Sequence, residues 1–282
     1  MSEKIVELTE RSIIIVGVGL IGGSIAAALR RRHPDLSIIG VGRNSERLRK
    51  AQEAGFLTGF TTTISQDTIP SESLGVVCLP VDQIPSAVIE LLGAGCSLVT
   101  DAGSVKSRIC ESLLNKASKG FIGSHPIAGS EHSGYEHSDA DLFVNRLCVV
   151  TPLQNGTEQI DRVIRFWQAV GCNVQTMSPA EHDRILALTS HLPHIMASVS
   201  ASCVPSELLA FAGTGYRDTT RIAAGSASLW ASILIENAAH CITAIKSAEA
   251  QLAAFRKALE SDDSVAVEKL WRAASELRRQ LQ

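Results

Sequence analysis

The sequence lacks the features that mark several classes of protein. Seven of the 282 residues are cysteines, an odd number with no Cys-x-x-Cys pair, which argues against a disulfide framework and a zinc site. No run of about 18 or more apolar residues is present, so we expect no membrane span. The net charge is −3 with no basic stripe, so we expect no nucleic-acid partner. The opening residues hold no apolar core of an export signal, and we expect a cytoplasmic protein with free thiols.

Glycine and proline are also absent from the end of the chain. Eighteen of the 21 glycines precede residue 178, and neither glycine nor proline follows Gly225. Apolar runs punctuated by glycine are typical of alternating strands and helices, whereas a stretch without either residue favours helices. We therefore predict two domains, an α/β domain at 1–177 and an all-helical domain at 178–282.

The first domain is predicted to be a doubly wound parallel sheet of the Rossmann type. Short apolar runs predict strands at 12–16, 37–41, 75–79, 97–100, 121–123 and 147–150, and the first helix is expected at 24–32. Continuous apolar strands that alternate with helices indicate a parallel sheet covered on both faces.

The second domain is predicted to open at Ser178, with Ser178 as N-cap, Pro179 at the first helical position and Glu181 completing a capping box. The rest reads as helix, apart from a loop at 211–221, and the last helix is expected at 265–281. Apolar residues left over on these helices favour a homodimer.

A glycine motif follows the first predicted strand. Gly17, Gly19 and Gly22, with Leu20 and Ile21 between the last two, form G-x-G-x-x-G in front of a helix. The first glycine permits a tight turn, the second lets the backbone approach a pyrophosphate, and the third lets helix and strand pack closely. The helix N-terminus would then hold the pyrophosphate, so the motif predicts a dinucleotide site.

The end of the second strand bears on the choice of cofactor. NAD sites usually place an acid about 20 residues beyond the glycines, where it binds the ribose 2′-hydroxyl. This sequence has Gly42 there, followed by Arg43, Asn44 and Ser45, with Arg47 close behind. Glycine leaves room for a 2′-phosphate and arginine can bind it, so we expect NADP to be favoured, with NAD possible.

Two further motifs follow later strands of the sheet. Asp101, Ser104 and Lys106 belong to D-A-G-S-V-K, and His125 and Glu131 belong to H-P-I-A-G-S-E. Ligands of open α/β sheets bind at the carboxyl ends of the strands. We therefore expect Ser104 and His125 to face one another near a nicotinamide, and Asp101 to be among the cofactor contacts.

The helical half contributes S-H-L-P-H at 190–194 and G-T-G-Y-R-D-T-T-R at 213–221. His191 and His194 are three residues apart, so a helix would present both on one face. No acid accompanies them, so we expect no metal. Arg221 is suited to a bidentate hold on a carboxylate, and Asp218 to holding an arginine in place.

These five motifs together resemble the prephenate/arogenate dehydrogenase family, in order and spacing, over about residues 12–240. The resemblance implies a Rossmann domain followed by a helical dimerisation domain. It implies oxidative decarboxylation of prephenate to 4-hydroxyphenylpyruvate, in tyrosine biosynthesis, or of arogenate to tyrosine. Gly42 departs from the family's usual acid, which puts NAD as sole cofactor in doubt.

The resemblance also implies roles for single residues. His125 matches the base that takes the proton of the ring C4 hydroxyl as hydride leaves C4, and Ser104 matches the serine that orients this pair. Arg221 matches the arginine that binds the ring carboxylate. Further substrate contacts correspond to Glu131 at the pocket mouth, His194 at the substrate side chain, and Ser190 and Arg217 at lesser positions.

The residues leave alternatives open. His194 as a hydrogen-bond donor suits the keto group of prephenate, whereas an ammonium as in arogenate would want an acceptor. Arogenate dehydrogenase and a dual-specificity cyclohexadienyl dehydrogenase therefore remain alternatives to prephenate dehydrogenase. A 3-hydroxyacid dehydrogenase would need a catalytic lysine, and Lys246 lacks the expected glycine-rich lead-in. A non-catalytic NADP sensor would have no use for both His125 and Arg221.

Overall fold

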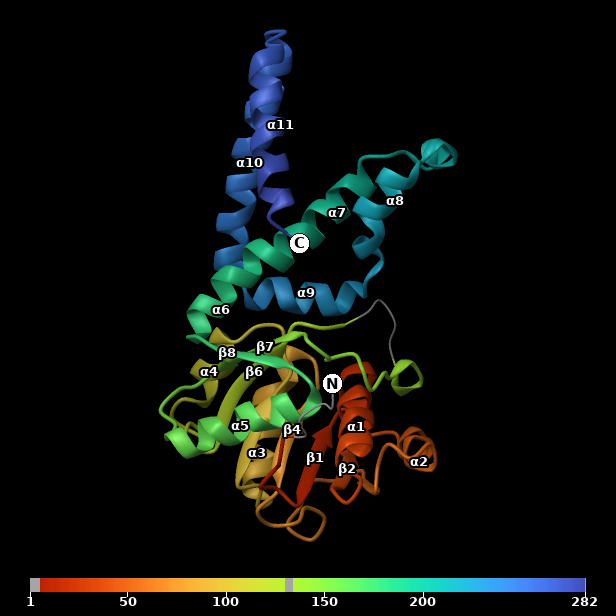
Figure 1. The fold of residues 1–282 in the computed structure, drawn as a ribbon, viewed down its shortest axis with the longest axis vertical. Coiled ribbons are helices and arrows are strands. Elements are labelled where there is room, and N and C mark those ends of the chain that lie inside the picture. Colours follow the sequence, from red (N-terminus) through yellow and green to blue (C-terminus); the bar gives the residue numbers. More distant parts are fainter. Residues whose placement is uncertain (1–5, 130–133, 282) are drawn as a thin grey trace.

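The protein has a sheet half and a helical half, stacked along its long axis (Figure 1). Figure 1 is a computed structural model, which describes residues 6–129 and 134–281. Most of both hydrophobic clusters lies in the sheet half, with Ile233 of the helical half joining the second one. In the helical half α10 and α11 stand out from the rest as an arm.

The sheet has eight strands in the order β3-β2-β1-β4-β5-β6-β7-β8. The strand order reverses between β1 and β4, which is the switch point where open α/β sheets bind ligands. The strands are β1 (Ser12–Val16), β2 (Ser37–Val41), β3 (Gly59–Thr61), β4 (Leu74–Val77), β5 (Leu98–Asp101), β6 (Phe121–Pro126), β7 (Leu147–Thr151) and β8 (Asn173–Thr176).

The sequence predicted a parallel sheet, and the sheet is parallel except at one pair of strands. The first six strands pair in parallel, but β7 runs antiparallel to β6, and β8 runs parallel to β7. A parallel connection needs a crossover, usually a helix, of a dozen or more residues. In the described part of the β6–β7 connection the one helical element is a short 3-10 turn (Tyr135–His137), whereas α5 (Thr157–Val170) joins β7 to β8.

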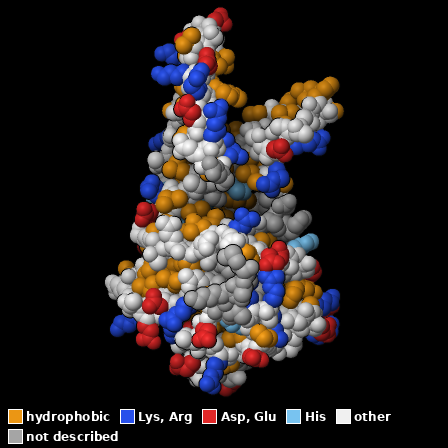
Figure 2. All heavy atoms as spheres, in the orientation of Figure 1, with side chains coloured by type: hydrophobic (Ala, Val, Ile, Leu, Met, Phe, Trp, Pro, Cys, Tyr) orange, Lys and Arg blue, Asp and Glu red, His pale blue; other side chains and the backbone are white. Residues whose placement is uncertain are grey.

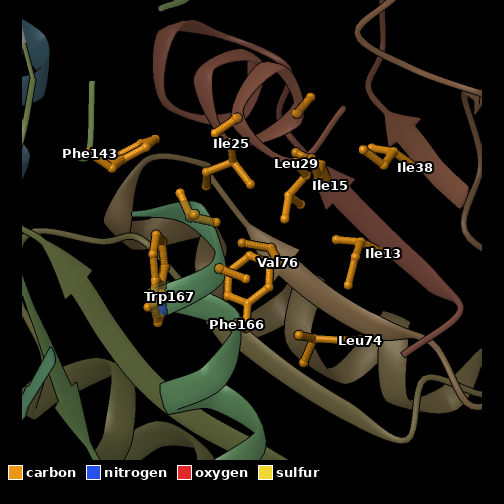
Figure 3. Close-up of a cluster of buried hydrophobic side chains, with 14 of the residues drawn as sticks. Ile13, Ile15, Ile25, Leu29, Ile38, Leu74, Val76, Phe143, Phe166 and Trp167 are labelled. Carbon is orange, nitrogen blue, oxygen red and sulfur yellow. The ribbon is translucent and has the colours of Figure 1, made fainter. Parts of the chain in front are cut away.

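Helices cover both faces of the sheet. Ile13 and Ile15 belong to one hydrophobic cluster and Ile14 and Val16 to the other, because successive side chains of a strand alternate in direction. The first cluster, shown in Figure 3, includes side chains from three helices, and Trp167 of α5 is fully buried in it. These helices are α1 (Leu20–Arg32), α2 (Ser45–Glu53) and α5, and the opposite face carries α3 (Ile84–Gly93) and α4 (Ser107–Leu113).

Helix α1 begins four residues earlier than the sequence predicted. Gly19 is its N-cap and Leu20 its first residue, so Gly22 and Gly23 lie inside the helix. A Cβ on Gly23 would come 2.1 Å from Ser138 Oγ. The lack of a side chain at these two glycines lets α1 pack closely against its neighbours, Ile15 of β1 and Ser138.

The second half is helical. Ser178 caps α6 as predicted, since its hydroxyl accepts from the Glu181 backbone N–H at 3.2 Å. The predicted loop at 211–221 is wrong, because α8 occupies most of it, between 3-10 turns at Ser206–Phe211 and Arg221–Ala224. The helices are α6 (Pro179–Leu186), α7 (Leu192–Ser202), α8 (Thr214–Thr220), α9 (Ala227–Glu236), α10 (Ala238–Glu260) and α11 (Ser264–Arg279), with a π-helical turn at Ala187–His191.

Large apolar side chains remain exposed on the helical half (Figure 2). Phe211 is 85% exposed and Trp271 is 71% exposed. A hollow of about 840 Å³ runs along α10 and α11 and is lined in part by Leu259, Val267 and Trp271. Within the described residues no single helix has the length and apolarity to cross a membrane; α9 and α10 pass that test only as a pair, bent by 96°.

Candidate active site

The glycine turn after β1 leaves open space at the start of a helix. Gly17 has a φ of +93°, and a Cβ there would come 2.5 Å from the Cys78 carbonyl oxygen. A Cβ on Gly22 would lie 2.2 Å from the Gly17 carbonyl oxygen, whereas one on Gly19 would meet nothing within 4 Å. Leu20 and Ile21 form the first turn of α1. The open N-terminus of a 13-residue helix fits the pyrophosphate of a dinucleotide.

Gly42 follows β2 directly, and its surroundings leave room for a side chain. A Cβ at this position would make ordinary contacts, at 3.7 Å, with the Leu48 side chain. Arg43 is exposed beside it. The absence of an acid at position 42 is therefore not imposed by packing.

Asn44 has a structural partner at the start of α2. Its Oδ1 accepts from the Arg47 backbone N–H at 3.0 Å, so the side chain caps the helix that begins with the exposed Ser45. The Arg47 guanidinium lies 3.8 Å from a Glu136 carboxylate oxygen, and both side chains are about half exposed. This exposed ion pair therefore contributes little to the stability of the fold.

Asp101 turns its carboxylate into the protein. It is fully buried, forms an ion pair with the equally buried Lys106, and accepts backbone N–H groups of Gly103 and Ser124 at 2.9 Å each. Lys106 Nζ also donates to the Ser124 carbonyl oxygen at 2.9 Å. The Asp101 carboxylate thus connects β5 to β6 and is buried, and its role as a cofactor contact stays a prediction.

His125 lies within β6, which continues to Pro126 rather than ending at residue 123 as predicted. The side chain is half-buried, and its Nδ1 lies 2.9 Å from Nε2 of His182 on α6. His182 Nδ1 lies 2.8 Å from Asp183 Oδ1, and both residues are buried. The structure thus joins His125 to two polar residues that the sequence analysis missed.

Asp183 connects the two halves of the protein. Its two carboxylate oxygens accept the backbone N–H groups of Lys106 and Ser107, each at 2.8 Å, at the start of α4. Asn237 Nδ2 donates to the Asp183 carbonyl oxygen at 2.8 Å and lies 3.2 Å from His191 Nδ1. Asp183 on α6 therefore contacts the start of α4 and, through its carbonyl oxygen, Asn237 between α9 and α10.

A signal for the missed pair was present in the helical pattern. His182 and Asp183 share the buried side of α6 with Leu186. Polar side chains on the apolar side of a helix are costly to bury unless they are hydrogen-bonded. A polar pair at this position therefore indicates a buried network.

Burial controls the ionisation of this network. It lowers the pKa of His125 well below the usual value, and the nearby basic side chains of His182, Lys106 and His191 lower it further. Burial also lowers the pKa of His182, and this effect outweighs the opposing effect of the hydrogen bond that His182 donates to Asp183. For Asp183, burial raises the pKa, but hydrogen bonds from His182, Ser107 and Lys106 prevail and lower it. At neutral pH both histidines are neutral and Asp183 is ionised.

A second group of predicted residues gathers around His194. Its Nδ1 lies 2.9 Å from the Ser190 carbonyl oxygen, and its ring stacks on Trp230 with centroids 3.7 Å apart. Burial lowers the pKa of His194, and the nearby Arg221 charge adds to this. A cavity of about 380 Å³ is lined by His194, Trp230 and apolar side chains that include Ile222. Arg221 itself is exposed at the start of a 3-10 turn.

The hydrogen bond of His194 reverses one expectation. A carbonyl oxygen only accepts, so His194 Nδ1 carries the proton, and a neutral ring then offers its Nε2 as an acceptor. The sequence analysis had treated His194 as a donor that suits a keto group. In this tautomer His194 gives no argument for prephenate over arogenate.

The structure says less about the three remaining predicted residues, Ser104, Arg217 and Glu131. Ser104 is half-buried between β5 and α4, and in the described part of the chain its side chain makes no hydrogen bond with His125. Arg217 lies exposed on α8, where its Nε donates to the Ala212 carbonyl oxygen at 3.4 Å. Glu131 lies outside the described residues. The functional roles given to these three residues stay predictions.

Both halves of the chain match models of one family. Residues 25–176 match the nucleotide-binding domain of prephenate dehydrogenase, and residues 178–273 match its dimerization domain. The chain belongs to the prephenate dehydrogenase family. As a member of this dehydrogenase family it is an oxidoreductase, with a Rossmann-type sheet and a helical dimerization domain.

Named relatives agree with this assignment. A cyclohexadienyl dehydrogenase of Zymomonas mobilis is 31% identical over 265 residues, 90% of each chain. A prephenate dehydrogenase of Aquifex aeolicus, solved with hydroxyphenyl propionate and NAD⁺, has a TM-score of 0.90 and 32% identity, covering 98% of this chain and 100% of its own. A Synechocystis arogenate dehydrogenase has a TM-score of 0.81 and 25% identity, covering 96% and 100%.

Gly19 and Gly22 of the glycine motif should respond differently to alanine. Gly22→Ala places a Cβ 2.2 Å from a backbone oxygen, so we expect a loss of about 1–3 kcal/mol of stability. Gly19→Ala meets open space and should keep the melting temperature, but its Cβ enters the region of the pyrophosphate and should raise the cofactor Kd on the order of tenfold. Thermal melts and cofactor titration test both. A wild-type melting temperature for Gly22→Ala, or unchanged affinity for Gly19→Ala, would contradict this account of the turn.

Proposed function

We propose that the protein oxidatively decarboxylates prephenate to 4-hydroxyphenylpyruvate, using a nicotinamide cofactor. The observation that carries the proposal is the neutral, half-buried imidazole of His125, placed at the carboxyl edge of a nucleotide-binding sheet. The boundary between the domains, 1–177 and 178–282, is part of this proposal, and the matched ranges 25–176 and 178–273 support it.

The protein's own groups perform the proton transfer. A bound nicotinamide supplies the hydride acceptor. A neutral imidazole at His125 accepts the proton of the C4 hydroxyl as the C4 hydride departs, and loss of CO2 then leaves an aromatic ring. The same proton returns to the ring oxygen. Ser104 is proposed to help orient the hydroxyl.

The carboxylates of the substrate need cationic partners. Arg221 is proposed to hold the ring carboxylate, and its charge acts on the neighbouring His194 ring. His194 is proposed to contact the substrate side chain, with Ser190, Arg217 and Glu131 as further contacts. Orientation and charge placement then account for most of the catalysis.

Arogenate is a second candidate substrate, favoured by a specific observation. The neutral His194 ring offers Nε2 as an acceptor, which suits the ammonium of arogenate. The similarity to a cyclohexadienyl dehydrogenase and to an arogenate dehydrogenase supports the same reading. We propose that both substrates are used, with prephenate as the main one.

The helical half is proposed to form the homodimer. Its match to a dimerization domain and the exposed Phe211 and Trp271 side chains support this. The hollow along α10 and α11 has the apolar lining that a second copy would cover.

Activity and its dependence on His125 are tested together. Purified protein with prephenate and NADP or NAD should raise the absorbance at 340 nm, and arogenate should be compared by kcat/KM. His125→Asn removes the base and should lower kcat by about 10²–10⁴-fold with little change in KM. A variant that keeps more than about a third of wild-type kcat would remove His125 from the role of base.

Arg221→Ala should act mainly on substrate affinity. Charge-assisted hydrogen bonds to a carboxylate contribute about 1.5–3 kcal/mol, so KM should rise about 10- to 100-fold. Arg217→Ala is the matched comparison, since Arg217 is also exposed but is proposed as a lesser contact. An Arg221→Ala change in KM below about threefold would show that this side chain does not hold the carboxylate.

We propose that NADP is preferred because position 42 lacks the acid that repels a 2′-phosphate and Arg43 can bind that phosphate. A preference of roughly tenfold in kcat/KM is expected. Gly42→Asp has room for its Cβ, 3.7 Å from Leu48, and should erase or reverse the preference. Measurements at fixed ionic strength are needed because exposed phosphate contacts weaken with salt. Equal or better use of NAD by the wild type would overturn the proposal.

A further inference from the structure

A second histidine stands behind His125. His182 is fully buried on α6, with its ring centroid 5.1 Å from that of His125. Its Nε2 lies 2.9 Å from His125 Nδ1, and its Nδ1 lies 2.8 Å from Asp183 Oδ1. A continuous line of hydrogen bonds thus runs from the sheet into the helical half.

The Asp183 carboxylate at the end of this line determines which nitrogen of each histidine carries the proton. An ionised carboxylate only accepts, so Asp183 requires a proton on His182 Nδ1. A neutral His182 then has its lone pair on Nε2, and His125 Nδ1 has to donate to it. A neutral His125 with its proton on Nδ1 has its lone pair on Nε2.

The surroundings hold Asp183 in its accepting state. Its oxygens also receive the backbone N–H groups of Lys106 and Ser107, at 2.8 Å each, and neither donor is able to change its role. Hydrogen bonds of this kind lower the pKa of Asp183 despite its burial. The direction of the whole line is therefore set by backbone donors at the start of α4.

We propose that His182 is a positioning residue, which accepts the Nδ1 proton of His125 and so keeps the His125 lone pair on Nε2. An unrestrained neutral imidazole favours the opposite tautomer, with the proton on Nε2, which is unable to act as a base there. The part that names the substrate hydroxyl as the proton's source rests on the proposed function, whereas the tautomer itself does not.

The proton transfer balances with this arrangement. The hydroxyl O–H bond breaks and a bond from Nε2 of His125 to the proton forms, while the Nδ1 proton stays between His125 and His182. The resulting imidazolium donates to His182, whose other nitrogen still donates to Asp183. After CO2 leaves, the proton passes from Nε2 to the ring oxygen, and His182 and Asp183 never change their protonation.

The first test separates kcat from KM. His182→Phe removes the acceptor and should lower kcat on the order of 10- to 100-fold, with KM for substrate and cofactor within threefold. His182→Gln restores an acceptor for His125 in its amide oxygen and should recover kcat to within about tenfold of the wild type. A folded His182→Phe variant with kcat within threefold of the wild type would overturn the proposal.

A matched control removes a histidine from the same polar cluster without touching the line. His240 Nδ1 lies 2.9 Å from Asn237 Oδ1, so the variant His240→Gln perturbs the cluster but not the Asp183 carboxylate. Its kcat should stay within about twofold of the wild type. A loss as large as that of His182→Phe would mean that general loosening, and not His125 orientation, is responsible, and would overturn the proposal.

The tautomer is measured directly in the wild-type protein without substrate. Nitrogen-15 NMR of histidine-labelled protein distinguishes the two neutral forms, and His125→Asn identifies the His125 signals. We expect His125 to carry its proton on Nδ1 in the wild type and to shift toward Nε2 in His182→Phe. A wild-type His125 protonated on Nε2 would overturn the proposal, even if His182→Phe fails to fold. Wild-type protein that oxidises neither substrate would contradict the proposed function alone.

Discussion

One buried carboxylate, that of Asp183, organises this protein. An ionised group out of water is costly unless it is hydrogen-bonded, and Asp183 meets this requirement with two backbone N–H groups of α4 and the ring of His182. These donors come from both halves of the chain, so satisfying the charge also docks the helices on the sheet edge. The orientation of the His125–His182 pair follows from the same set of hydrogen bonds.

A buried ion pair, Lys106 with Asp101, holds neighbouring strands of the sheet together. Lys106 and Asp101 are both fully buried, and their shared contacts with Ser124 lock the residue directly before His125 in β6. Breaking a buried pair by removing one partner is strongly destabilising, so the two residues are constrained together. His125, the proposed base, thereby lies between this strand and α6, and its burial lowers the pKa of the imidazole.

The groups proposed to select ligands lie in more open surroundings than the groups proposed to act on them. Arg43 and Arg221 are exposed, and His194 is half-buried against Trp230. A change at such positions alters contacts with a cofactor or substrate but leaves the buried network in place.

The sequence by itself determined the strands around the switch point, the glycine turn, the helical second half and the family. These rest on local signals, since runs such as 12–16 and the glycines at 17, 19 and 22 impose their conformation on their own neighbours. Only the tertiary structure decided the direction of β7, the helix α8 and the partners of His125. His182 is 57 residues from His125 along the chain, and the proton on each ring depends on Asp183 receiving donors from α4, 76 and 77 residues earlier. The helical pattern of α6 can mark His182 and Asp183 as buried, but it does not name their partners, because those contacts arise only when distant segments pack together and exclude water.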